Sequence, residues 1–401
     1  MKFVLEFMEK HVRPLFLPGG WLHKLYPVYE AGDTFLFTPP DVTPGPPHVR
    51  DALDLKRYMI TVCLALAPCI LFGIFNAGYQ YNTVNQVAEA GFLQHVTRGA
   101  WIVLPIIFVS YAVGGFWEVL FAVVRKHEIN EGFLVTGMLF PLTLPPTIPL
   151  WQVALGISFG VVIGKEIFGG TGFNVLNPAL TARCFLYFAY PAQISGDKVW
   201  TVLKDPAHVI EGFTGATALA VAKAAPAGVH ILDSLRAAGF TWPRVFFGLE
   251  PGSIGETSAF CALLGAVVLI LSGVGAWRTM AGGALGLAAT MALVNRLPIA
   301  DQLPAAALPF WYEMAMGGVA FGIIFMATDP VSSAATNAGK WIYGFLIGFL
   351  TIVIRLFNPA FTAGNMLAIL FCNVLAPLID HLVVQTHLAA RRRHLRAFRH
   401  A

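Results

Sequence analysis

The chain has 401 residues, of which 57% are hydrophobic and only 12% are charged. Soluble globular domains carry about 25% charged residues, so this composition excludes an ordinary soluble protein and indicates an integral membrane protein. The net charge of +4 is small and argues against a nucleic-acid partner. The five cysteines stand singly in apolar stretches, without a CxxC pair that would indicate a zinc site or an iron–sulfur cluster.

The first 56 residues mix charges, prolines and aromatic residues and contain no apolar core of a cleaved signal peptide. Within them, residues 4–16 predict an amphipathic helix at the membrane interface. The Pro- and Gly-rich part that follows is expected to lie extended over the cytoplasmic face. We therefore expect residues 1–56 to form a cytoplasmic N-terminal extension.

Ten apolar stretches follow, which predicts an all-α polytopic membrane protein with about ten transmembrane helices. Several stretches are shorter than the roughly 20 residues that cross a bilayer. Because irregular backbone survives in a membrane only where protein or a cavity surrounds it, we expect broken helices, first of all in stretches three and five. The stretches cover residues 58–75, 101–124, 132–144, 150–163, 175–190, 257–271, 280–294, 311–327, 341–357 and 365–379.

An even number of spans places both termini on one side, and most Lys and Arg residues then fall on that side, which the positive-inside rule identifies as the cytoplasm. The longest loop consequently lies on the outer face. The tripeptide Asn-Pro-Ala occurs at 177–179 and again at 358–360. An internal repeat of two five-helix halves would explain this recurrence, and chance explains it equally well. We expect a first half over residues 57–192, an outer loop over 193–255, a second half over 256–380 and a basic cytoplasmic tail over 381–401.

Three acids lie in or beside the apolar stretches, where a charge is costly and often functional. Glu118 lies within the second stretch, and Asp329 and Asp380 follow the eighth and tenth, all toward the cytoplasmic side. One interpretation is an entry site for a cation or a proton. The other is structural, with Asp329 capping a turn and Asp380 lying at the interface.

Two glycine-rich segments are further candidates. The segment 169–178 carries Asn174 and Asn177, whose amides suit either a polar ligand or the cap of a helix, and the segment is not a dinucleotide fingerprint because no strand precedes it. Gly114 and Gly115 lie one turn before Glu118 and suit either close helix packing or a notch for a flat ligand.

In the outer loop, residues 211–220 form a short polar turn ahead of an Ala-rich run that predicts a helix. From the residues alone, Thr217 is best interpreted as the N-cap of that helix.

Motifs along nearly the whole chain resemble those of one family, the B subunits of sodium-translocating NADH:quinone oxidoreductases, which are bacterial respiratory complexes. The D subunits of Rnf complexes are similar in their core but usually lack the long N-terminal extension, which favours the quinone reductases. The motifs that carry the resemblance are at residues 126–133, 168–179, 188–197, 214–217, 251–256 and 325–332.

The resemblance implies a covalent FMN, joined by a flavin transferase through a phosphoester bond to the last threonine of a Thr-Gly-Ala-Thr motif. Here the motif is Thr214, Gly215, Ala216 and Thr217, with Thr214 where the family often has serine. The outer position of the loop agrees with the side on which the family places this flavin. One departure is an outer-loop insertion around residues 203–210, which leaves the motif intact.

The resemblance assigns the other candidates as well. It implies a noncovalent riboflavin on the cytoplasmic side, a quinone site and acids of a sodium pathway. The matching residues are Asn174 and Asn177 for riboflavin, Gly114 and Gly115 for the quinone, and Glu118, Asp329 and Asp380 for sodium.

The function implied by the resemblance is electron transfer from FMN through riboflavin to ubiquinone, coupled to sodium export across the bacterial inner membrane. The chain has no NADH-binding motif, FAD site or iron ligands of its own, so partners are expected: the A, C, D, E and F subunits, with the NADH and FAD chemistry in F and another covalent FMN in C. Two alternatives remain open at this point, a cofactor-free secondary transporter and an Rnf-type subunit. The sequence also leaves open whether sodium or protons are coupled.

Overall fold

The computed structural model describes residues 6–37, 45–47, 55–87, 90–127, 129–204, 215–226, 230–296, 304–358 and 364–399. Within these ranges the secondary structure is helical, without a β-strand. Among the described residues, five helical stretches are long and apolar enough to cross a membrane. They lie in α4 (Leu55–Val84), α5 (Phe92–Arg125), the stretch Leu150–Phe168 that begins with α7 (Leu150–Val162), α17 (Asn337–Phe357) and α18 (Asn365–Arg399).

Shorter helices occupy the other predicted stretches, so each of the ten contains helix. At about 1.5 Å per residue, the 11 residues of α6 and the 12 residues of α8 cover less than the roughly 30 Å of a hydrocarbon core. The shorter helices are α6 (Gly132–Leu142), α8 (Pro178–Ala189), α13 (Ala259–Leu271), α14 (Trp277–Val294), α15 (Phe310–Ala315) and α16 (Val319–Phe321), the last continued by a π-helical turn, η7 (Gly322–Met326).

Among the ten stretches as far as they are described, the eighth is interrupted. Stretches three and five each hold one short, unbroken helix, so the expectation of a break within them is wrong. The backbone turns at Gly317 and Gly318, whose φ angles of +62° and +71° end α15 before α16 begins. By contrast, Pro141 lies in the last turn of α6, and Pro178 is the first residue of α8, a position where proline needs no N–H partner.

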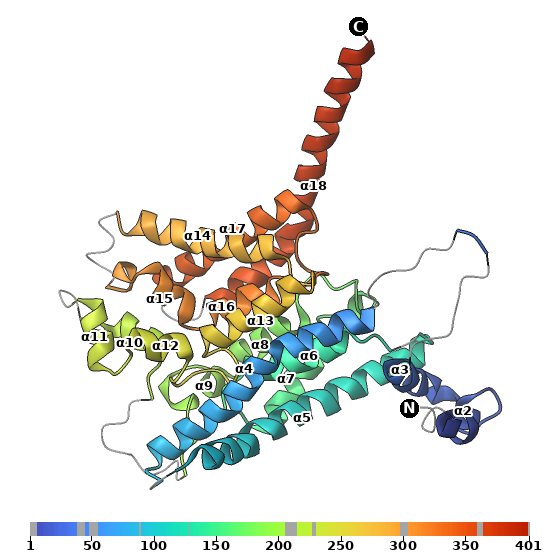
Figure 1. The fold of residues 1–401 in the computed structure, drawn as a ribbon, viewed down its shortest axis with the longest axis horizontal. Helices are drawn as coiled ribbons and strands as arrows, with labels where there is room; N and C mark the ends of the chain where they lie inside the picture. The colour runs from blue at the N-terminus through green and yellow to red at the C-terminus, as the bar shows by residue number, and fades with distance from the viewer. Residues whose placement is uncertain are drawn as a thin grey trace.

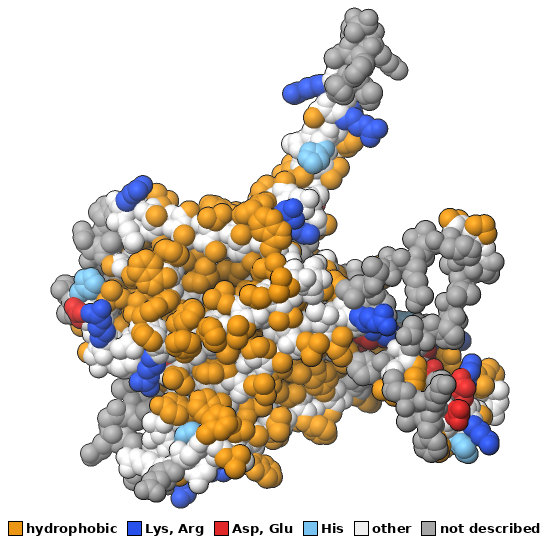
Figure 2. All heavy atoms as spheres, in the orientation of Figure 1, with side chains coloured by type: hydrophobic (Ala, Val, Ile, Leu, Met, Phe, Trp, Pro, Cys, Tyr) orange, Lys and Arg blue, Asp and Glu red, His pale blue; other side chains and the backbone are white. Residues whose placement is uncertain are grey.

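The long helices run side by side along the molecule (Figure 1), with α4 beside α5 and α13. In the second half of the chain, α17 packs against both α14 and α18. Figure 2 shows hydrophobic side chains over most of this bundle, with charged side chains mainly at its two ends. Exposed side chains of α13 belong to this apolar surface, which suits contact with lipid tails. The large exposed side chains of α13 are Phe260, Leu263, Leu264, Val267, Val268, Ile270 and Leu271.

Glycines let the closest helix pairs approach each other. A Cβ atom added to Gly286 of α14 would lie 2.1 Å from the carbonyl oxygen of Phe345 in α17. A Cβ atom added to Gly78 of α4 would lie 1.8 Å from the carbonyl oxygen of His95 in α5. Small residues at such contacts are what allows helices without a hydrophobic driving force to pack in a bilayer.

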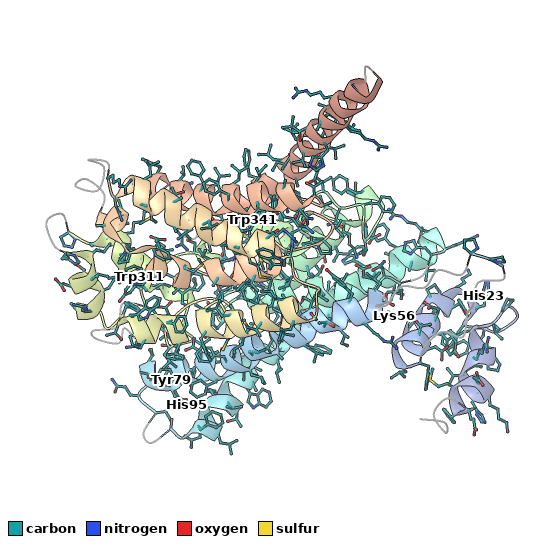
Figure 3. The ribbon with its side chains drawn as sticks, turned by 45° about the horizontal axis from the view of Figure 1, so that its top comes forward. His23, Lys56, Tyr79, His95, Trp311 and Trp341 are labelled. Carbon is teal, nitrogen blue, oxygen red and sulfur yellow. The ribbon has the colours of Figure 1, made fainter. Side chains whose placement is uncertain are left out.

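The N-terminal region is helical over much of its described length, in a π-helical turn (Met8–Val12), α2 (Arg13–Phe16) and α3 (Tyr26–Leu36). The prediction of helix is therefore confirmed over the described residues of 4–16, its place at the membrane interface stays a prediction, and the expectation of an extended segment after it is wrong for α3. Lys56 ties this region to the bundle, with Nζ 3.7 Å from Glu30 Oε1 and 3.0 Å from Glu131 Oε1. In Figure 3, Lys56 and His23 lie at this end of the molecule and Tyr79 and His95 at the other.

The opposite end carries the short helices of the predicted outer loop. The Ala-rich run after Thr217 forms α10, as predicted. Beyond the second half, α18 continues without a break through most of the predicted tail, so residue 380 is no helix boundary. The loop helices are α9 (Pro191–Ile194), α10 (Ala218–Ala224), α11 (Ile231–Ala237) and α12 (Trp242–Phe247).

Candidate functional site

Two cavities lie near opposite ends of α13, and four of the candidate residues line them: Asn174, Asn177 and Asp329 in one and Thr217 in the other. The first is formed around the C-terminal end of α13 by α4, α6, the turn before α8 and the turn after η7. The second lies near the N-terminal end of α13, where α8, the start of α10 and the break between α15 and α16 meet. Because α13 has 13 residues, its two ends are about 20 Å apart.

Asn174 and Asn177 both line the first cavity, and each also supports the local backbone. Asn177 Oδ1 caps α8, accepting hydrogen bonds from the backbone N–H groups of Ala179 at 3.0 Å and Leu180 at 3.2 Å. Asn174 Nδ2 donates to the carbonyl oxygen of Leu176 at 3.0 Å. The cap interpretation is therefore confirmed for Asn177 and not for Asn174, and both amide-bearing residues lie in the wall of a cavity.

Asp329 shares the first cavity with these asparagines. Its carboxylate accepts hydrogen bonds from Ser332 Oγ at 2.7 Å and from the backbone N–H of Val331 at 3.3 Å. It therefore caps a turn, as the structural alternative predicts, and also places a carboxylate in the wall of the cavity.

Asp380 is in a different environment. Its carboxylate accepts hydrogen bonds from the backbone N–H groups of Ala335 at 2.7 Å and Thr336 at 3.0 Å, and from Thr336 Oγ1 at 2.5 Å. It does not line the first cavity, and its contacts fix the turn that enters α17.

Glu118 of α5 is buried and forms an ion pair with Lys165, which is itself only 2% exposed. Lys165 Nζ also donates to Thr171 Oγ1 at 3.2 Å and lies 3.5 Å from Glu166 Oε1. Arg125 completes the cluster, with Nη1 3.1 Å from Glu166 Oε2. Lys165 also lines the first cavity, so it connects Glu118 to the pocket that holds Asn174 and Asp329.

The glycine pair contacts this cluster through an aromatic ring. A Cβ atom added to Gly114 would lie 2.4 Å from the ring of Phe133, whereas one added to Gly115 would lie 3.8 Å from it. The Phe133 ring therefore fills the notch at Gly114, as the packing interpretation predicts. The ring centroid lies 6.0 Å from Lys165 Nζ.

Thr217 lines the second cavity and caps α10, accepting a hydrogen bond at Oγ1 from the backbone N–H of Ala220 at 3.3 Å. Gly215, with a φ of +66°, and Ala216 lead into this cap. Thr214 and residues 205–210 of the predicted insertion lie outside the described residues. The N-cap interpretation is thus confirmed, and the same hydroxyl lies at a cavity wall.

Charged groups surround Thr217. Arg183 of α8 lines the cavity, and its Nη1 lies 3.1 Å from Glu256 Oε1. Glu250 is 4% exposed, and within the described part of the chain its Oε2 has no hydrogen-bond partner. Burial raises the pKa of Glu250 to about 8, although the positive charge of Arg244 opposes this.

These residues fit a group that is joined to Thr217 through a phosphate. The hydroxyl provides the attachment point, and the Arg183 guanidinium in the same wall suits an anionic phosphate. Gly317 and Gly318, at the break between α15 and α16, line the cavity without side chains and so leave its space open. Glu250, whose Oε2 has no hydrogen-bond partner among the described residues, lines the same cavity.

Sequence reasoning missed Lys165, Arg183 and Glu250 as site residues. The signal for Arg183 was available, because a lone arginine in an apolar stretch requires a nearby acid, which is Glu256. The signal for Lys165 was weaker, since it follows α7 at the membrane boundary, where lysines are common.

The fold and the cavities define a multi-helix membrane protein with two polar sites. The family model described as the NQR2, RnfD, RnfE family matches residues 42–389, and the chain belongs to this family. The chain is 50% identical to the B subunit of the Na(+)-translocating NADH-quinone reductase of Azotobacter vinelandii, over 97% of this chain and 98% of that protein. It is 50% identical to the B subunit from Stutzerimonas stutzeri, over 96% and 97%, and 48% identical to that of Pseudomonas aeruginosa (strain PAO1), over 98% of each. The resemblance that the motifs predict is thereby confirmed.

Proposed function

We propose that the chain is the membrane subunit of a sodium-translocating NADH:ubiquinone reductase that holds a covalent FMN at Thr217 and a riboflavin in the first cavity. The observation that carries this proposal is the pair of cavities at opposite ends of α13, one with a threonine hydroxyl beside Arg183 and the other with Asn174 and Asn177. When bound, the flavins supply electron transfer toward ubiquinone, with the A, C, D, E and F subunits as partners.

The chain's own residues position these groups. Thr217 anchors a phosphate, which the flavin transferase attaches, and Arg183 balances its charge. Asn174 and Asn177 offer amide groups in a cavity wall, where Asn177 caps α8 and Asn174 bonds to the backbone of Leu176. Glu118 and Asp329 supply acids for a sodium path at the same end, and we place Gly114 and Gly115 beside the quinone.

We also propose that ten spans form two five-helix halves in a bacterial inner membrane, with both termini in the cytoplasm. Helix adjacency supports the halves. In the first, α7 packs on α5 and α8, and in the second, α17 packs on α14 and α18. In each half, the fourth helix therefore packs against the second and the fifth helix of that half, as a structural repeat requires.

Two alternatives remain as outcomes of experiment. The full-length similarity to proteins named as B subunits of quinone reductases favours that function over an Rnf-type role. A secondary transporter without cofactor would use the interrupted helix and the buried acids directly, and it differs from our proposal in having no bound flavin.

The riboflavin site is tested by replacing Asn174 with leucine in the assembled complex. We expect the noncovalent flavin, extracted by acid and measured by chromatography, to fall at least tenfold, because the leucine removes the polar amide from the cavity wall. Asn85 is a matched control because it follows the end of α4 that lies away from the first cavity. There its Nδ2 donates to the carbonyl oxygen of Val202 at 3.1 Å. Equal riboflavin in the Asn174→Leu and Asn85→Leu complexes would exclude the first cavity as its site.

A further inference from the structure

The last part of α18 leaves the bundle as an uncovered helix. Among the described side chains of α18, Val383 is the last buried one, and those of residues 384–393, the tail segment, are all exposed. Figure 1 and Figure 3 both show these turns projecting from the side of the bundle, across the direction of α14 and α17. Because α17 is a candidate span, a helix that crosses its direction runs along the plane of the membrane.

Two features fix the place where the tail segment begins. Pro377 lies within α18, and a proline inside a helix removes a backbone hydrogen bond and bends the helix. About one turn later, the Asp380 carboxylate accepts hydrogen bonds from the backbone N–H groups of Ala335 and Thr336, which precede α17. The tail segment therefore starts beside the end of a span, at the level where the surface of a membrane lies.

The tail segment belongs to a strongly basic part of the chain. Residues 381–401 contain five arginines and neither aspartate nor glutamate. Arg391, Arg392 and Arg393 are exposed, and Figure 2 shows basic side chains on the projecting helix. Clusters of basic residues next to a span attract anionic lipid headgroups, and each residue near the surface strengthens binding about fivefold.

Apolar side chains share one face of the tail segment with two of these arginines. Val384 and Leu388 are four residues apart, so they are neighbours on one face of the helix, and they are 45% and 40% exposed. Arg391 and Arg392 follow Leu388 by three and four residues and continue this face. Arginine covers apolar surface with its stem while its guanidinium reaches the polar layer. An apolar face flanked by arginines is typical of a helix that lies in the membrane interface.

We propose that the tail segment lies on the membrane surface and binds anionic phospholipid headgroups. Val384 and Leu388 enter the interface, and the arginines contact the headgroup phosphates. An acidic surface of a partner subunit would also attract the arginines, but the course of the helix across the spans and its apolar face favour lipid. The attraction is electrostatic, so salt weakens it. It requires neither of the proposed flavins.

Trypsin, which cleaves after exposed arginines, tests this proposal on the assembled complex. The complex is placed in nanodiscs of phosphatidylcholine alone, or of phosphatidylcholine and phosphatidylglycerol in equal parts, and the loss of the C-terminal end is followed by intact mass. We expect this loss to be at least about tenfold slower in the anionic nanodiscs, because each of three arginines contributes about fivefold, and the difference to shrink as salt rises. Arg236 of α11, which is 64% exposed at the opposite end of the molecule, is an internal reference for trypsin activity in each kind of nanodisc.

A pair of substitutions separates the apolar face from the charge. Val384→Gln with Leu388→Gln keeps every arginine, so the tryptic sites are unchanged while the apolar face is lost. Thr386→Gln with Ala390→Gln is the matched control, because these residues are exposed and have the same spacing on another face of the helix. We expect the first pair to lose the protection and the control pair to keep it.

Three results would overturn the proposal. Equally fast cleavage in both kinds of nanodisc would mean that the tail segment binds nothing. Equally slow cleavage in both would mean that a partner subunit covers it, whatever the lipid. Protection that persists in Val384→Gln with Leu388→Gln would mean that the apolar face does not enter the interface.

Discussion

Replacing Arg355 with methionine is expected to remove most of the folded subunit from the membrane. Arg355 of α17 is 5% exposed and forms an ion pair with Glu313 of α15. It also donates to the backbone carbonyl groups of Glu313 at 2.9 Å and Met316 at 2.8 Å, so one guanidinium holds the end of α15 at the break in the eighth stretch. Removing one partner of a buried ion pair costs about 3–5 kcal/mol, a large part of the roughly 5–15 kcal/mol that stabilises a typical protein.

The measurement is the amount of monodisperse complex after detergent extraction, followed by size-exclusion chromatography. Arg236 of α11 is the matched control, because its pair with Asp233 is 64% and 65% exposed and an exposed pair contributes little. Replacing Glu313 with leucine in the Arg355→Met background should restore part of the yield, since no unpaired buried charge then remains. Equal yields of Arg355→Met and Arg236→Met would contradict this role.

Gly286→Ala is expected to destabilise the subunit, although alanine favours helices over glycine by about 1 kcal/mol. The new methyl group would lie 2.1 Å from the carbonyl oxygen of Phe345, a backbone atom of α17, so the two helices must separate. Overpacking of this kind costs about 1–3 kcal/mol. The sign of the effect therefore separates close helix packing from helix propensity.

The thermal unfolding midpoint of the purified complex measures this effect. Gly32 of α3 is the control, because a Cβ atom added there has no heavy atom within 4 Å among the described neighbours. We expect Gly32→Ala to leave the midpoint unchanged or raise it, and Gly286→Ala to lower it. A midpoint that rises in both variants would mean that α14 and α17 do not pack as closely as described.

Much of the fold follows from the apolar pattern, because a span needs a long apolar segment wherever its neighbours lie. The interruption at Gly317 and Gly318 was missed, since adjacent glycines in an apolar stretch equally suit close packing. The helix α3 was also missed, because glycine and proline are typical of an extended segment. Its composition contains glycine and proline, but Pro27 lies in the first turn, where the helix tolerates it.

The sequence predicts those site residues that lie together in one short motif. Asn174 and Asn177 are three residues apart and belong to one turn, so one segment places both at a cavity. The pair of Glu118 with Lys165 joins residues 47 positions apart, and it depends on how α5 packs against α7. The pattern of a single sequence does not reveal that packing.

The same reasoning applies around Thr217. The motif at residues 214–217 identifies the hydroxyl, but the partners in its cavity come from three other parts of the chain: Arg183, Glu250 and the break at Gly317. The charge of Arg183 in an apolar stretch calls for a nearby acid, but the sequence does not show which acid that is. That Glu250 is buried beside it, with a pKa raised by burial, is a property of the assembled fold.

The most direct test of the account is ultraviolet fluorescence of the denatured subunit in a gel, after expression with its partner subunits and flavin transferase. Thr257 lines the same cavity as Thr217, so Thr257→Ala is a matched control for Thr217→Ala. We expect a fluorescent band in the wild type and in Thr257→Ala, and no band in Thr217→Ala. This pattern would exclude a cofactor-free transporter. Absence of fluorescence from the wild-type protein, with the transferase shown to be active on another subunit, would contradict the covalent flavin at the centre of this account.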